Sequence, residues 1–155
     1  MLTSPHLMRT MGLKFARSIL DAEKLDAEQK LWRAVVVNAL EDSMIVQSDR
    51  KASLLKIFAH NWILQRSKDF ETVCAWGNLD PDDIQECYVR ALKNHELKFT
   101  HRQIMWFDYD KLYKKMLKAD VKYKKQLRRD LTVFRNKVRD TPTTFLSTIF
   151  VSAFV

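Results

Sequence analysis

The stretch SKDFETVCAWGNLDPDDIQECYVRAL, residues 67–92, predicts two helices joined by a tight corner. Ser67 is a favoured N-cap residue, and Gly77 ends the first helix as a residue that tolerates a left-handed C-cap. Asp80 followed by Pro81 marks the start of the second helix, because Asp caps free amides and Pro fits the first turn. The corner therefore has the outline of a helix-turn-helix.

The second helix of this corner has the wrong charge for reading DNA. In a helix-turn-helix reader, the N-terminal part of the second helix enters the major groove among phosphates. Here that part carries Asp82, Asp83 and Glu86, and the first cation is Arg90. Because like charges repel, we interpret this helix as scaffold or as a surface that faces another protein.

Two amphipathic helices are expected before the corner. Asp26 and Gln29 form a capping-box pattern for a helix that runs to about Ile45, and Ser48 or Asp49 begins the next. In that next helix the expected inward residues are Leu54, Leu55, Phe58, Trp62 and Ile63, and the expected solvent-facing residues are Arg50, Lys51, Lys56 and Gln65.

The first 20 residues contain Arg9, Lys14 and Arg17 and no acid. Their apolar positions predict one amphipathic helix, within residues 1–24, that docks on the rest of the domain. A mitochondrial presequence has a similar composition and is the alternative. The apolar positions are Leu7, Met8, Met11, Phe15 and Ile19.

The positive charge is concentrated in one segment. Lys111 to Arg139 holds 12 Lys/Arg and two Asp, a net charge of +10 in 29 residues, whereas the remainder has 15 basic and 17 acidic residues.

After a second capping box at Thr100 and Gln103, one long basic helix is expected from Asp108 or Asp110. Its apolar stripe is Leu112, Met116, Ala119, Tyr123, Leu127, Leu131, Phe134 and Val138. The cations expected to contact phosphates are Lys114, Lys118, Lys122, Lys125, Arg128 and Arg129. A solvated surface is the plainer interpretation of the same charges.

The apolar segment TPTTFLSTIFVSAFV, residues 141–155, is expected to form a helix capped by Thr141, with a strand as the alternative. Eleven mostly apolar residues are unfavourable in water, so this tail is expected to enter the core or a partner subunit. Phe150 and Phe154 are the positions expected to serve that contact.

No catalytic pattern is visible. The four His lie on separate expected elements, as surface or boundary residues, and the chain contains no glycine-rich phosphate loop. Cys74 and Cys87 are expected to be buried, reduced thiols, so neither a metal nor a cofactor is predicted. The four Trp fall in apolar stripes and are expected in the core, whereas Tyr109, Tyr113 and Tyr123 come closest to the exposed, cation-flanked ring that stacking on nucleobases requires.

Residues 31–92 resemble a widespread group of small bacterial, phage and prophage proteins with the pattern LWxAV, a later Trp, DFxxVC, a small-residue turn and LDPxxV. The matching positions are Leu31, Trp32, Ala34, Val35, Asp69, Phe70, Val73, Cys74, Gly77, Leu79, Asp80 and Pro81. The resemblance implies a phage or bacterial setting, and thus the cytoplasm of the host cell. Members often carry basic residues after the LDP turn, where this chain has Asp83 and Glu86.

Few Gly and Pro and no apolar run of about 20 residues favour an all-α domain without a membrane span. We expect one domain over residues 1–155, a compact bundle of about six helices with a helix-turn-helix-like core over 25–95 and a basic helix and apolar tail over 100–155. The expected function is a phage-associated, non-enzymatic protein that binds nucleic acid or modulates transcription. The alternative is a protein-interaction module that docks on an acidic host protein or self-assembles through the tail. Its expected contact residues are Asp82, Asp83, Glu86, Phe150 and Phe154.

Overall fold

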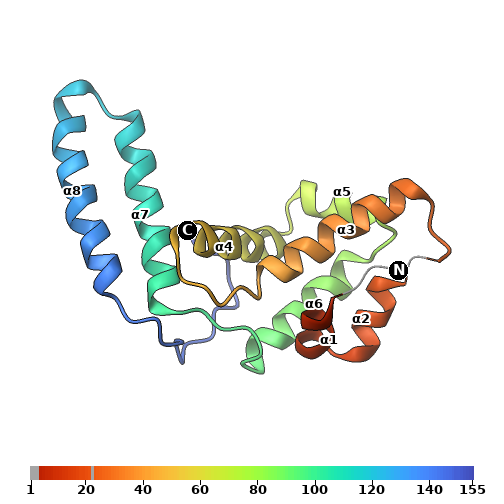
Figure 1. The fold of residues 1–155 in the computed structure, drawn as a ribbon. Coiled ribbons are helices and arrows are strands. Elements are labelled where there is room, and N and C mark those ends of the chain that lie inside the picture. The colour runs from red at the N-terminus through yellow and green to blue at the C-terminus, as the bar shows by residue number, and fades with distance from the viewer. Residues whose placement is uncertain (1–3, 22) are drawn as a thin grey trace. The chain divides into compact units, whose positions relative to one another are not determined.

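Eight helices form the regular structure of residues 4–21 and 23–155, the part of the chain that the computed structural model describes (Figure 1). They are α1 (Pro5–Met11), α2 (Leu13–Leu20), α3 (Ala27–Asp42), α4 (Arg50–Gln65), α5 (Lys68–Trp76), α6 (Pro81–Lys93), α7 (His101–Lys118) and α8 (Val121–Asp140). Within these residues no strand forms, and an isolated antiparallel bridge joins Thr100 and Phe145. The all-α prediction is confirmed, but the expected number of helices was too low.

The chain divides into two compact units. The core unit comprises Met1–Ile45, Leu55–Lys98 and Thr148–Val155, and the hairpin unit comprises Val46–Leu54 and Phe99–Ser147. Helix α4 therefore contributes its first residues to the hairpin unit and the rest to the core unit. The expectation that residues 1–155 are one domain stays a prediction.

The N-terminal segment forms two short helices rather than one. Gly12, with φ +90° and ψ 151°, separates α1 from α2, a conformation that glycine adopts without strain. Ser4 caps α1 by accepting a hydrogen bond from the amide of Leu7 at 3.2 Å. Leu7 and Ile19 are fully buried, so both helices dock on the core unit as expected.

The predicted tight corner is present between α5 and α6. Ser67 Oγ accepts from the Phe70 amide at 3.2 Å, and Asp80 Oδ1 accepts from the Asp82 amide at 2.9 Å, so both predicted N-caps are confirmed. Gly77 is not left-handed, since its φ is −84°, and Asn78 takes the positive φ of 55° instead.

The structure shows a different reason why residue 77 is glycine. A Cβ atom at this position would lie 3.0 Å from the backbone nitrogen and 3.1 Å from the Cα of Arg33. Backbone atoms within a helix cannot move aside cheaply, so the C-terminus of α5 approaches α3 this closely only without a side chain.

Helix α4 buries a different face from the predicted one. Ile63 is buried as predicted, but the other buried residues of this helix include Ser53, Lys56, Ile57, Ala59 and His60, whereas Leu55 and Phe58 are nearly half exposed. The prediction was wrong because it ranked residues by polarity alone. Polar groups inside the core unit instead supply hydrogen-bond partners for Lys56 and His60.

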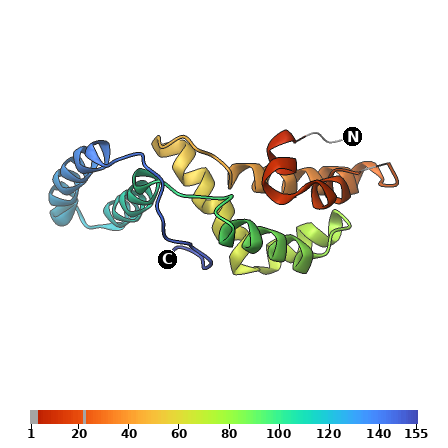
Figure 2. The same ribbon diagram turned by 90° about the horizontal axis from the view of Figure 1, so that it is seen from below.

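The predicted long basic helix is a helical hairpin. Helix α7 begins earlier than expected, at its capping box of Thr100 and Gln103, and ends at Lys118. Ala119 and Asp120 are extended, with ψ of 153° and 156°, and the chain then returns as α8. Figures 1 and 2 both show α7 and α8 side by side. Because the chain folds back, the apolar residues of α7 pack against those of α8. One straight helix would leave this apolar stripe without a partner surface.

The tail also departs from prediction, because residues 141–155 contain no helix. Within the core unit, the side-chain amide of Asn61 donates to the Phe154 carbonyl at 3.0 Å and accepts from the Phe154 amide at 2.7 Å. The Phe150 and Phe154 ring centroids are 5.0 Å apart. The end of the tail is thus held on α4, partly buried, as irregular chain.

Candidate nucleic-acid interface

The hairpin unit has its own apolar core and its own polar ties. Trp106, Tyr109, Met116, Leu131 and Val138 are buried between α7 and α8. These five residues fix the two helices against each other through contacts along their facing sides. The unit can therefore present a defined surface on its outer sides.

Several cations of the hairpin unit are used to build it. Arg102 Nε donates to the carbonyl of Thr141 at 3.0 Å and its Nη2 to that of Arg139 at 2.9 Å, which satisfies acceptors at the end of α8. Arg135 Nη2 donates to the hydroxyl of Tyr109 at 2.8 Å. The guanidinium of Arg50 lies 5.0 Å from the ring centroid of Tyr109. These arginines have structural roles.

Charge differs sharply between the two units. The hairpin unit contains 15 Lys/Arg and 6 Asp/Glu, a net charge of +9, and the core unit contains 12 and 13, a net charge of −1. An excess of this size on a small unit produces a field that attracts polyanions.

All six cations predicted from the sequence are exposed, but they lie in two rows. On α8, Lys122, Lys125 and Arg129 follow one another at three- and four-residue steps on the side opposite the buried stripe, and Arg128 flanks them. On α7, Lys114 and Lys118 are four residues apart on that helix's outer side. Because the helices pack through their inner sides, the two rows lie on outer sides of the hairpin, and their nearest members in sequence, Lys118 and Lys122, flank the turn at Ala119 and Asp120.

Ion pairing distinguishes these cations. Lys114 Nζ lies 3.0 Å from the carboxylate of Asp110, which is nearly buried. Within the described residues, Lys118, Lys125 and Arg129 form no ion pair. Their charge is therefore the most available for a phosphate.

The residues predicted for protein contact fall into separate settings. Asp82 is exposed and forms an ion pair with Arg66, which also pairs with Glu71 at 3.0 Å. Asp83 and Glu86 line a pocket of the core unit. Phe154 packs on the ring of His60 at a centroid distance of 5.1 Å, within the same unit.

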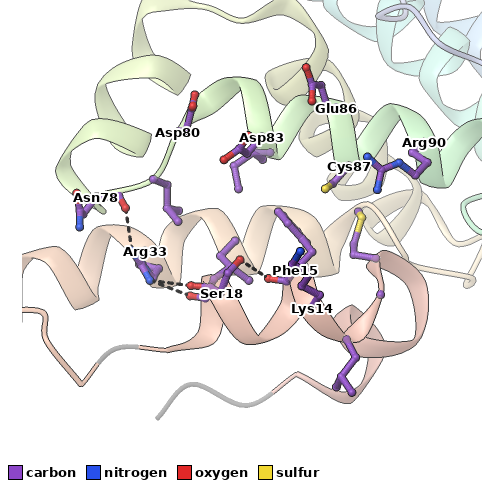
Figure 3. A pocket seen from close by; sticks show the side chains of 16 residues that line it. Lys14, Phe15, Ser18, Arg33, Asn78, Asp80, Asp83, Glu86, Cys87 and Arg90 are labelled. Carbon is purple, nitrogen blue, oxygen red and sulfur yellow. Dashed lines mark hydrogen bonds between the residues drawn. The ribbon is translucent and has the colours of Figure 1, made fainter.

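That pocket has a volume of about 590 Å³ and lies between α6 and the N-terminal helices (Figure 3). Leu79 and Ile84 contribute apolar lining, and Figure 3 shows the carboxyl groups of Asp80 and Glu86 directed away from α2. Burial raises the pKa of the Cys87 thiol, so it stays protonated and is a poor nucleophile. Among the described residues, no three or more His, Cys, Asp or Glu are grouped to hold a metal ion.

Arg33, which no sequence pattern indicated, is almost fully buried beside this pocket. Its Nε donates to the carbonyl of Gly77 at 3.0 Å and its Nη2 to that of Asn78 at 2.9 Å. Its Nη1 donates to the carbonyls of Ser18 at 3.2 Å and Asp21 at 2.8 Å. Burial lowers the pKa of Arg33, and the charge of Asp21 opposes that shift. This arginine joins α3 to the end of α2 and to the corner.

Sequence analysis also missed a buried polar group around α4. Lys56 Nζ donates to the carbonyl of Lys98, and His60 Nε2 donates to the carbonyl of Ser152 at 3.0 Å. His60 Nδ1 is then the acceptor for the Tyr88 hydroxyl at 2.6 Å. Burial lowers the pKa of Lys56 to about 7 and, helped by the charge of Lys56, that of His60 to about 4. The sequence signal that could have indicated this buried group is the four-residue spacing of Lys56 and His60, which places both side chains on one side of the helix, next to the buried Ile57.

Three other expectations meet mixed outcomes. His60 is buried rather than at a surface or boundary. Trp106 lies in the core as predicted, but Trp76 is half exposed and packs on Trp32 at a centroid distance of 4.7 Å. Cys74 is buried, unpaired and protonated, since burial raises its pKa to about 11.

Comparison of the chain with models of protein families, with curated proteins and with solved structures gives no match. Over residues 4–21 and 23–155, no helix combines the length and the apolar character that crossing a bilayer requires.

Proposed function

We propose that this protein binds nucleic acid through the hairpin unit, without catalysing a reaction, as an accessory protein in a phage or bacterial setting. The observation that carries the proposal is the separation of charge, with +9 on the hairpin unit and −1 on the core unit. Cations that are exposed and not committed to ion pairs, such as Lys118, Lys125 and Arg129, neutralise phosphates without reading sequence. The resemblance of residues 31–92 supports the setting.

The test is a charge reversal at three exposed positions. Lys118→Glu, Lys125→Glu and Arg129→Glu combined should abolish binding to a 20-base-pair DNA duplex at low salt. For the unmodified protein, the logarithm of the affinity should fall linearly with the logarithm of salt concentration, by about 0.9 per neutralised phosphate. Fluorescence anisotropy across salt concentrations measures both quantities.

The matched control reverses three exposed lysines of the core unit. Lys30→Glu, Lys68→Glu and Lys93→Glu change the net charge by the same amount and should leave most of the affinity and the salt slope intact. Equal loss in both triple variants would attribute binding to net charge alone. Undiminished binding after reversal in the hairpin would overturn the proposal.

A protein partner is the second candidate function, favoured by the pocket that Asp83 and Glu86 line in the core unit. Because the hairpin variant leaves that pocket unchanged, the two functions can be separated. A complex with a host protein that survives nuclease treatment and is unaffected by the hairpin reversals would support the protein-interaction function.

A further inference from the structure

The hairpin tip carries an aromatic ring that its packing does not explain. Tyr109 is buried, and Tyr113 is partly buried beneath the guanidinium of Arg50, 5.0 Å from its ring centroid. Tyr123, in the first turn of α8, is 60% exposed although it belongs to the apolar stripe. Of the three tyrosines near the basic segment, Tyr123 is therefore the one that offers a ring to a ligand.

A groove runs beside this ring. Its volume is about 510 Å³, within the range of roughly 300–1,000 Å³ that small-ligand sites occupy. Leu127 and Ala119 supply apolar surface, and Gln126 supplies an amide whose Nε2 donates to Asp130 at 3.0 Å. Lys115 and Lys118 line the groove from α7, and Asp120 lines it from the turn, so the cations outnumber the single carboxylate. A flat ring, apolar surface and a polar group at the edge are what an unpaired nucleobase needs.

The surroundings of the groove suit the phosphates on either side of such a base. Residues 114–125 contain six Lys and one Asp, a net charge of +5 in 12 residues. Lys122 Nζ lies over one face of the Tyr123 ring, 5.9 Å from its centroid, so the opposite face is the one that a base would stack on, with this cation close by. Stacking on an aromatic ring within a positively charged groove is the general mode of single-strand binding.

The arrangement of the two cation rows favours a flexible strand over a rigid duplex. The rows lie on the outer sides of α7 and α8, and Lys118 and Lys122 lie on either side of the turn between the two helices. A straight duplex on one side reaches one row, whereas a single strand that bends over the tip reaches both and passes Tyr123. We propose that the hairpin tip binds single-stranded nucleic acid by stacking an unpaired base on Tyr123, an inference that rests on the proposed function.

An anionic membrane surface is the competing occupant, because Leu117 and Val121 are also exposed near the tip. The cations on α8 argue against it. The row from Lys122 to Arg129 spans about 10 Å along the helix, so a flat surface that touches the tip leaves its far end in water. A strand can follow the whole row.

The experiment compares Tyr123→Leu with Tyr123→Phe by fluorescence anisotropy, using an 18-nucleotide thymidine single strand and a duplex of equal length. Tyr123→Leu should weaken single-strand binding about 10- to 100-fold, the range for loss of one stacked base, and should leave duplex binding and the salt slope unchanged. Tyr123→Phe keeps the ring and should bind as the unmodified protein does. Because the side chain is exposed, both variants should keep the melting temperature, which circular dichroism checks.

Each outcome separates this inference from the proposed function. If the unmodified protein binds the single strand and Tyr123→Leu binds it equally well, base stacking is wrong and the proposed function stands. If the unmodified protein binds neither nucleic acid, the proposed function fails as well. If the protein sediments with phosphatidylserine vesicles but binds neither nucleic acid, the tip is a membrane-binding surface and the inference is overturned.

Discussion

At the scale of single residues, Gly77 shows how a neighbouring element can determine a residue's identity. Its φ of −84° is open to any residue, so the backbone does not require glycine here. The constraint is the main chain of Arg33, 3.0 Å from where a Cβ would lie. This explains why a sequence pattern for helix ends placed the glycine correctly and gave the wrong reason for it.

Gly77→Ala should lower the free energy of unfolding by about 1–3 kcal/mol, the typical cost of forcing one extra carbon into a packed contact. Urea denaturation followed by tryptophan fluorescence measures the change. Asn78→Gly is the matched control, because glycine adopts the positive φ of 55° freely and the change should be small. A loss in Asn78→Gly as large as that in Gly77→Ala would contradict the assignment of the cost to the close approach between residue 77 and Arg33.

At the scale of elements, the hairpin is stabilised by one apolar stripe shared between α7 and α8. Leu131 is 5% exposed in that interface, and Val133, two residues along α8, is 70% exposed. The two positions therefore report opposite faces of one helix.

Leu131→Ala should cost about 2–5 kcal/mol of stability, since it removes a large buried side chain. Val133→Ala should be neutral or slightly stabilising, because alanine favours the helix more than valine does. Urea denaturation of both variants measures the difference. Similar costs at the two positions would contradict the buried face described for α8.

Sequence predicted the elements best where their determinants are local. The capping boxes at Asp26 and Thr100 were predicted correctly because each depends on residues three positions apart. The turn at Ala119 was missed because the apolar stripe continues in phase through it and neither Gly nor Pro marks it. The buried face of α4 was missed because its partners, including Ser152, come from distant parts of the chain.

The candidate site was predictable in composition and less so in arrangement. The six cations that the sequence predicted for phosphate contact are all exposed. Their division into two rows follows from the chain reversal after Lys118, which no local signal disclosed. The same reversal leaves Tyr123 near the tip, where the apolar stripe alone would have buried it.

At the scale of the whole molecule, buried ionisable groups should make stability depend on pH. The folded His60, with a pKa of about 4, is neutral in the range where an ordinary histidine of pKa 6.5 is protonated. The folded Lys56, with a pKa of about 7, is neutral in the range where an ordinary lysine of pKa 10.5 is charged. In both ranges the unfolded chain binds more protons, so the free energy of unfolding rises with pH.

Stability should therefore increase from about pH 4 to 6.5 and again from about pH 7 to 9. Above about pH 9, Cys74 should offset the contribution of Lys56, because burial raises the folded pKa of this thiol from 9.0 to about 11. Tyr88 acts in the same sense as Cys74 above about pH 10, because burial raises its pKa and the unfolded tyrosine then loses its proton first. Lys56→Met should remove the rise between pH 7 and 9 and retain the acid part. Urea denaturation at several pH values measures the profile, and an unchanged alkaline rise in Lys56→Met would assign it to another group.

The contacts of Arg33 have a consequence for how the core unit loses its structure. Its guanidinium is satisfied by carbonyls from two segments far apart in the chain, at residues 18–21 and 77–78. If either segment departs, the other is left facing a desolvated charge with unpaired donors, which is costly. Partly opened states that keep one segment are therefore disfavoured, and the two segments should open together, so that a single side chain makes unfolding of this region cooperative.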